Sequence, residues 1–211
     1  MLAGDALETL LDSYESERRP VGAEVVARTR AASVDYGREP RGKLERLADT
    51  QILVSYRNTP WVRDDAKGLA ATVPEAGDRA PDVGGLRRYG IGFPIRLFDV
   101  LRGTEHVVLA HLASSKSQSE ISQLGTFARE MNARFGLRVR IAAIASHSHL
   151  AVCPGVALYH DAETRMRTAY GTEDAVFLIR PDGYIGWRGR SWRDIGLESQ
   201  LNRILKEAEG G

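Results

Sequence analysis

The single cysteine of the chain, Cys153, is the first residue whose chemistry could support catalysis. A thiolate attacks peroxides and disulfides when a nearby cation or a helix N-terminus lowers the thiol pKa. Three histidines in this part of the sequence, His147, His149 and His160, are the groups that would activate it. No predicted helix start or run of cations adjoins Cys153, so the favoured interpretation is a small buried or half-buried apolar residue in a turn.

Two of these histidines form the segment His147-Ser148-His149, and His160 and Asp161 follow it. Histidines two residues apart on a strand point to one face, and a third ligand would complete a zinc site. The spacing is not that of a compact zinc motif, and the segment follows a predicted strand as part of a loop. We therefore predict loop histidines and no metal site.

Two adjacent serines, Ser114 and Ser115, would be nucleophiles if a histidine served as their base. The Gly-x-Ser-x-Gly turn that exposes the catalytic serine of α/β-hydrolases is absent from the sequence. The serines therefore predict no hydrolase site.

Three arginines near the C-terminus, Arg188, Arg190 and Arg193, are interleaved with Trp187 and Trp192. Arginine and tryptophan together bind anions or stack on nucleic-acid bases. The chain has 29 Lys and Arg against 28 Asp and Glu, so it has no net field that would attract nucleic acid or anionic lipid. The favoured interpretation is a solvated hairpin edge, and neither a nucleic-acid nor a membrane partner is predicted.

The elements that must position these residues differ between the two halves of the chain. Apolar residues recur every three to four positions near the N-terminus, which predicts a helix over residues 5–35. Pro20 should kink or split this helix because it removes a backbone donor. A second short helix is predicted over residues 41–49, and the many glycines and prolines of residues 57–92 predict a long irregular connection.

The second half alternates predicted strands with predicted helices in the order β-α-β-α-β-β-α, which is the order of the thioredoxin fold. The predicted class is therefore α/β: a thioredoxin-like C-terminal domain over residues 93–211, preceded by a helical segment over residues 1–56 and the irregular connection over residues 57–92. The predicted strands are residues 106–112, 137–145, 175–180 and 184–187, and the predicted helices are residues 119–135, 162–170 and 194–208.

Thioredoxin chemistry needs two thiols after the first strand of the fold, where the following helix lowers the thiol pKa. The corresponding segment is residues 113–118, and it contains no cysteine. Redox thioredoxins also have a proline before the hairpin, and Ala175 stands at that position here. We therefore expect the fold without its redox chemistry.

Several separated motifs resemble one family, the class A FAD-dependent aromatic-ring hydroxylases of the phenol and polyketide hydroxylase type. The resemblance covers nearly the whole chain and concerns the region that follows the flavin-binding domain. The motifs are Leu11-Asp12-Ser13-Tyr14-Glu15, Glu17-Arg18-Arg19-Pro20-Val21, Tyr56-Arg57-Asn58-Thr59-Pro60, Gly77-Asp78-Arg79-Ala80-Pro81-Asp82, Arg96-Leu97-Phe98-Asp99-Val100-Leu101-Arg102-Gly103 and the stretch from Val176 to Arg188.

The resemblance implies a parent enzyme that uses FAD and NADPH to insert one oxygen atom into an aromatic ring. It places the flavin-binding and catalytic residues in a part that this chain is expected to lack, so it assigns no catalytic, cofactor-binding or metal residue here. Gly4-Asp5-Ala6 resembles a flavin motif only by coincidence, because too few residues separate it from the next motif. No Gly-x-Gly-x-x-Gly follows a predicted strand.

Three functional hypotheses remain open. The first is a non-catalytic C-terminal module with a structural or oligomerisation role, which forms a homodimer through the helix at residues 5–35 or binds a flavin-domain partner. The second is a complementing subunit of a split flavin monooxygenase. The third is a divergent thioredoxin-fold thiol enzyme that uses Cys153. A cytoplasmic location is expected, because no signal-peptide pattern or apolar run of about 18–20 residues is present.

Overall fold

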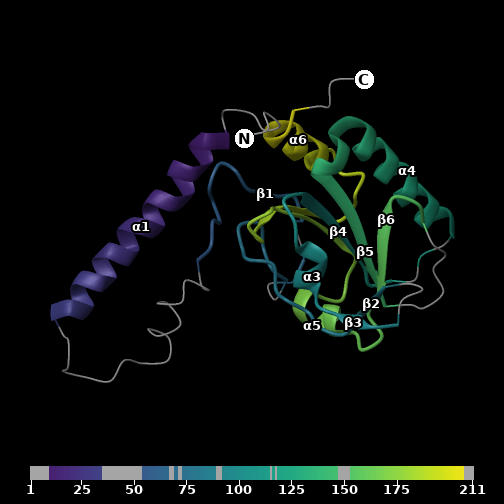
Figure 1. The fold of residues 1–211 in the computed structure, drawn as a ribbon, viewed down its shortest axis with the longest axis horizontal. Coiled ribbons are helices and arrows are strands. Elements are labelled where there is room, and N and C mark those ends of the chain that lie inside the picture. The colour runs from purple at the N-terminus through teal and green to yellow at the C-terminus, as the bar shows by residue number, and fades with distance from the viewer. Residues whose placement is uncertain are drawn as a thin grey trace.

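The computed structural model describes residues 10–34, 54–66, 69–70, 73–88, 92–114, 116, 118–146 and 153–206. Within these residues lies a sheet of eight strands in the order β1-β8-β7-β4-β5-β6-β2-β3 (Figure 1). The sequence predicts the central strand β4 well: β4 spans His106–Leu112, and its apolar run Val107–Ala110 is fully enclosed. A strand with both faces covered is typically a continuous apolar segment, as this run is.

The four central strands have the thioredoxin arrangement. Strand β4 pairs in parallel with β5 (Val139–Ala145), and helix α4 (Gln118–Phe135) connects them. Strand β7 (Ala175–Ile179) pairs antiparallel with β4, and β8 (Ile185–Gly189) pairs antiparallel with β7. The predicted α/β class with a thioredoxin-like C-terminal domain is confirmed.

Both faces of the sheet are apolar, because side chains alternate along each strand. In β4, Val108 and Ala110 face one buried cluster, whereas Val107 and Leu109 face the other. Each cluster is covered by helices, which Figure 1 shows on opposite faces of the sheet. The helices are α4 and α6 (Ile195–Ile204) over the first cluster, and α3 (Leu97–Leu101) and α5 (Arg165–Tyr170) over the second.

Between the predicted strands and helices of the second half, the structure adds strand β6. Strand β6 (Val156–His160) lies between β5 and α5 in the chain and pairs in parallel with β5. The sequence shows it only as a short apolar stretch after Pro154-Gly155, and five residues carry too little pattern to separate a strand from a loop. A single 3₁₀ turn, η1 (Gly136–Arg138), precedes β5.

The segment predicted as an irregular connection supplies strands to both sides of the sheet. Strand β1 (Arg63–Asp64) pairs in parallel with β8, and β2 (Leu86–Arg88) pairs antiparallel with β6. Strand β3 (Pro94–Ile95) then pairs with β2. Strands of two or three residues have no readable alternation, so their existence depends on the partner strand and not on local sequence.

The predicted N-terminal helix is confirmed for its described part, α1 (Leu10–Val34). The helix continues through Pro20, so the proline, which removes one backbone donor, does not split it; a kink there stays a prediction. Figure 1 shows α1 reaching away from the sheet, with its N-terminal end close to α6. The predicted helix at residues 41–49 lies outside the described residues. Among the described helices, none has the length and apolar character needed to cross a bilayer.

Candidate functional site

The position of the thioredoxin thiols is occupied by a polar cluster. The carboxylate of Asp174 accepts hydrogen bonds from the Ser114 backbone N–H at 2.9 Å and from the Ser114 hydroxyl at 2.7 Å, and the Lys116 ammonium also binds it. Burial alone would raise the pKa of Asp174, but the hydrogen bonds from Lys116 and Ser114 lower it below its ordinary value. The carboxylate is thus held ionised against Lys116 and is not a proton donor at neutral pH.

A small cavity of about 160 Å³ adjoins this cluster and includes His111 in its lining. The His111 side chain is buried, and neither ring nitrogen has a hydrogen-bond partner among the described residues. Burial lowers the pKa of His111 to about 4, so the imidazole is neutral at physiological pH. Ser114, the described member of the serine pair, is bound to Asp174 and not to a histidine; Ser115 lies outside the described residues.

Cys153 lies far from this cluster in the chain and packs beneath α4. Its side chain is buried, and its Sγ donates a hydrogen bond to the Ile121 carbonyl at 3.2 Å. Gly125 leaves room for the sulfur, because a Cβ at that position would stand 2.4 Å from Sγ. Burial raises the pKa of the Cys153 thiol above its ordinary value, which is the opposite of what a nucleophilic thiol requires.

The predicted absence of a metal site concerns residues that the structure describes only in part. His147 and His149 lie outside the described residues, and His160 is half-buried at the end of β6. Across the described ranges, no three His, Cys, Asp or Glu side chains form a group that would hold a metal ion. The absence of a metal site therefore stays a prediction.

The prediction of a solvated hairpin edge is wrong for Arg188 and Trp187. Strand β8 is not an edge strand, because β1 pairs with its outer side. Trp187 is fully buried and donates a hydrogen bond to Asp65 at 2.7 Å. Arg188 is 7% exposed; its Nε lies 2.7 Å from Asp64, and its Nη1 donates to the carbonyls of Val73 and Pro74.

The other members of that cluster are less enclosed. Arg190 is about half exposed and pairs with Glu173 at 2.6 Å, and Arg193 is exposed. Trp192 is partly buried against the core. The five residues therefore do not form one surface.

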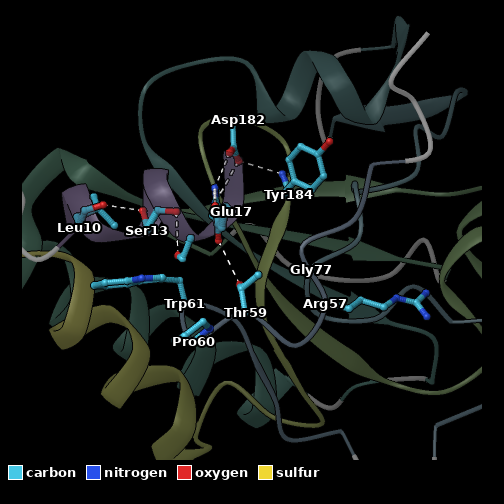
Figure 2. A network of polar contacts seen from close by, with 12 residues as sticks. Leu10, Ser13, Glu17, Arg57, Thr59, Pro60, Trp61, Gly77, Asp182 and Tyr184 are labelled. Atoms are coloured by element: carbon cyan, nitrogen blue, oxygen red, sulfur yellow. Dashed lines mark hydrogen bonds and ion pairs between the residues drawn. The ribbon is translucent and has the colours of Figure 1, made fainter. Parts of the chain in front are cut away.

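Three of the motifs that resemble the hydroxylase family meet at one corner of the molecule, which we call the α1 junction and define as Glu17, Thr59, Arg180 and Asp182. Glu17 is 4% exposed, and its two carboxylate oxygens accept hydrogen bonds from Nη1 and Nη2 of Arg180 at 2.7 and 2.8 Å. Asp182 binds the same guanidinium at 2.6 Å, and the Thr59 hydroxyl donates to Glu17 at 3.4 Å. Figure 2 shows Glu17 between Asp182 and Thr59.

The guanidinium of the α1 junction lies between its two carboxylates. Burial would lower the pKa of the Arg180 guanidinium, but its hydrogen bonds to Glu17 and the charge of Asp182 raise it above its ordinary value. The ring of Tyr56 lies beside this group, with the guanidinium carbons of Arg18 and Arg180 at 5.8 and 5.6 Å from its centroid. Such distances place both cations against the aromatic face.

A second polar group, next to the α1 junction, joins one more motif to the motif that contains Thr59. Arg57 donates two hydrogen bonds to Asp78, at 2.7 and 2.6 Å. Gly77 has a φ of +96°, and a Cβ at this position would stand 2.3 Å from the Arg57 backbone nitrogen. The backbone N–H of Gly77 donates to the carbonyl of Ile185 in β8. Only glycine fits this close approach, which explains the Gly-Asp pair of the motif.

Beneath α1 lies a cavity of about 330 Å³ with a largely apolar lining. Leu10, Trp61, Leu178 and Ile204 supply apolar walls, and His106 is a polar member of the lining. Burial, followed by the charge of Arg180, lowers the pKa of His106 to about 4. The contact between α1 and the domain is therefore polar at Glu17 and loosely packed around it.

Sequence reasoning found the motifs of this corner but not the contacts between them. Glu17 and Arg180 are 163 positions apart, and no local pattern pairs them. The sequence signal for this contact is the pair of motifs that resemble the hydroxylase family. Glu17 belongs to Glu-Arg-Arg-Pro, and Arg180 belongs to Arg-Pro-Asp-Gly.

Comparison with known proteins places these motifs in a family. Residues 73–208 match the sequence profile of the aromatic-ring hydroxylase C-terminal family. The chain is 33% identical over 230 aligned positions to the 4-methyl-5-nitrocatechol 5-monooxygenase of a Burkholderia species, covering 97% of this chain and 37% of that protein. It is 28% identical to the tetracenomycin A2 monooxygenase-dioxygenase of Streptomyces glaucescens, over 100% of this chain and 36% of that protein.

The fold comparison agrees. The flavin-dependent monooxygenase PieE, solved with FAD and substrate, matches 88% of this chain and 38% of its own chain with a TM-score of 0.56 and 18% identity. The chain thus spans little more than a third of the length of these relatives. Since the family profile covers most of the chain, the chain belongs to the aromatic-ring hydroxylase C-terminal family and is related to the C-terminal region of FAD-dependent monooxygenases.

Proposed function

We propose that this chain is a non-catalytic, structural C-terminal module of an FAD-dependent aromatic monooxygenase. The observation that carries the proposal is the cluster of Ser114, Lys116 and Asp174 at the place where thioredoxins hold their thiols. The lone cysteine of the chain, Cys153, is buried elsewhere with a raised thiol pKa. These features leave the fold without a group suited to thiol chemistry and favour a scaffold role.

We propose further that FAD and NADPH act in another part of the enzyme. A pyrophosphate binds at a helix N-terminus that follows a strand, and the turn from β4 to α4 is the place in this sheet to test for such a site. The donors of that turn, the Ser114 N–H and the Lys116 ammonium, already bind the carboxylate of Asp174. The Asp174 carboxylate would repel a second anion bound by these two donors.

Titration with FAD tests this assignment. We expect no saturable change in flavin fluorescence or absorbance when the purified chain is mixed with FAD at micromolar concentration, because Ser114 and Lys116, among the described residues of the β4–α4 turn, already bind Asp174. Saturable binding would contradict the module proposal. Peroxide or disulfide turnover that is abolished by Cys153→Ala would contradict it as well and would favour the divergent thiol enzyme.

For partners, we propose association through α1, with a second copy of the chain as the first occupant to test. Val26 and Val34, on the half of α1 that points away from the sheet, are 52% and 76% exposed. Exposed apolar side chains on a projecting helix favour a protein contact. We expect a dimer in sedimentation at micromolar concentration, and Val26→Glu should shift the protein toward the monomer.

A wild-type monomer under those conditions would count against the homodimer. It would leave a flavin-domain partner, either in the same enzyme or as the other half of a split monooxygenase. Leu137→Glu, an equally drastic change at an 85% exposed position on η1, is the matched control and should leave the sedimentation coefficient unchanged.

A further inference from the structure

We infer that Glu17 and Arg180 are positioning residues: their ion pair fixes the direction in which α1 leaves the thioredoxin-like domain. The inference rests on the proposed function in one respect, because the direction of α1 matters only if α1 joins this module to a partner or to a flavin-bearing part. The structural claim itself concerns the chain alone. It is therefore testable without flavin or substrate.

The geometry of the pair restricts rotation of α1. Both oxygens of Glu17 bind the two terminal nitrogens of Arg180, at 2.7 and 2.8 Å. A bidentate carboxylate–guanidinium pair is planar, so it sets an orientation as well as a distance. Arg180 is itself held from its other side by Asp182, at 2.6 and 3.2 Å, within the turn between β7 and β8. The guanidinium is therefore fixed to the sheet before α1 binds it.

Apolar packing does not supply the same restriction. Leu10 packs against the domain core, but Tyr14 is 71% exposed, and a cavity of about 330 Å³ lies between these residues and the domain. A loosely packed apolar contact permits several orientations of similar energy, because complementary packing is what selects one of them. The direction of α1 then depends on the polar contact at Glu17.

The electrostatic balance supports a role in orientation more than in net stability. Glu17 is 4% exposed and the Arg180 side chain 19%, so forming the pair removes both charges from water. The cost of that desolvation offsets most of the attraction in a buried pair. Replacing one partner leaves the other charge buried without it, so we expect Glu17→Gln and Arg180→Lys to lower the melting temperature as well as to widen the range of α1 orientations.

A small rotation at the junction has a large effect at the far end of α1. Ala31 lies fourteen residues beyond Glu17, which is about 21 Å along a helix that rises 1.5 Å per residue. A rotation of about 20° at Glu17 would move Ala31 by about 7 Å by that geometry. Such a displacement is readily measured between two spin labels.

The experiment measures the distance between spin labels at Ala31→Cys and Leu137→Cys in a Cys153→Ala background. Both label positions are exposed, and Leu137 lies on the domain at η1. With Glu17 and Arg180 intact, we expect a single narrow distance distribution. Glu17→Gln should broaden it, because the amide places an N–H₂ group against the guanidinium. Arg180→Lys should also broaden it, since an ammonium keeps the charge but loses the bidentate geometry.

The matched control is Glu15→Gln, which removes an exposed ion pair with Arg19 on the same helix. It should leave the distribution unchanged. An unchanged distribution in Glu17→Gln would overturn the inference, whether or not the melting temperature falls, because the pair would then be stabilising at most. Thiol turnover or FAD binding would overturn the proposed function and would leave this result unaffected, so the two failures are distinguishable.

Discussion

Replacement of Arg188 by methionine is expected to lower the free energy of unfolding by about 3 kcal/mol, the lower end of the range for breaking a buried ion pair. The Arg188 side chain is 9% exposed and binds Asp64 at 2.7 Å, and it also donates to the carbonyls of Val73 and Pro74. Without the guanidinium, all three acceptors lose a donor in a place that water reaches poorly. The lower end applies because Asp64 is 34% exposed and recovers part of its hydration.

Arg190→Met is the matched control for this measurement. Arg190 stands two positions further along the chain and also forms an ion pair, with Glu173, but the two side chains are 48% and 53% exposed. Exposed pairs contribute little, so the expected change is below about 1 kcal/mol. Urea denaturation of both variants gives the comparison. An equal decrease in the free energy of unfolding in the two variants would show that the buried contacts of Arg188 do not stabilise the fold more than an exposed ion pair does.

Acidification from pH 7 to pH 4 is expected to lower the free energy of unfolding by on the order of 5 kcal/mol through His106 and His111 together. Each has a folded-state pKa of about 4 against an ordinary value of 6.5. Between these values the unfolded chain binds a proton at each histidine and the folded chain does not. Stability is therefore full above pH 6.5 and is lost as the pH falls toward 4.

Burial causes both histidine shifts, and the pH range in which the histidines lose stability lies above that of the shifted carboxylates. Arg180 and Asp182 act on His106 in opposite directions, as do Arg167 and the two aspartates near His111, Asp161 and Asp174. Burial therefore dominates both histidine shifts. Asp78 and Asp174 have pKa values below 3.8, so the stability that they contribute is lost only under more acidic conditions.

Urea denaturation at several pH values between 4 and 7 measures the effect. His111→Leu should reduce the slope of unfolding free energy against pH by about 1.4 kcal/mol per unit, the share of one proton. Leucine suits the site because His111 is enclosed and its ring has no hydrogen-bond partner among the described residues. A slope in His111→Leu equal to that of the wild type would refute the assignment of a neutral buried histidine.

The sequence was sufficient for the centre of the fold because the relevant information there is local. The apolar run of β4, the periodicity of α4 and the Pro-Asp-Gly turn each predict an element within a few residues of its observed bounds. The positions of Arg188 and Trp187 could not be predicted in this way. Their burial depends on β1, a two-residue strand whose partner lies more than 120 positions further along the chain.

The candidate site shows the same limit. The motifs around Glu17, Tyr56, Gly77 and Arg180 were each recognisable, but their convergence is a property of the folded chain. A buried ion pair leaves no periodic trace in the sequence, since either residue alone is an ordinary charged side chain. Only the unusual requirement for glycine at position 77 could have indicated close backbone contact.

Strands β1 and β2 both belong to the segment between α1 and β4, and yet they extend the sheet at opposite edges. Strand β1 pairs with β8, and β2 pairs with β6. A fragment begun at residue 93 would leave the outer backbone groups of β8 and β6 without partners. Bare strands of this kind pair with strands of other molecules, which leads to aggregation. A fragment that is to stay monomeric in solution must therefore start upstream of Arg63. The predicted strands of the thioredoxin-like domain, the first of which is residues 106–112, would have suggested a much later start.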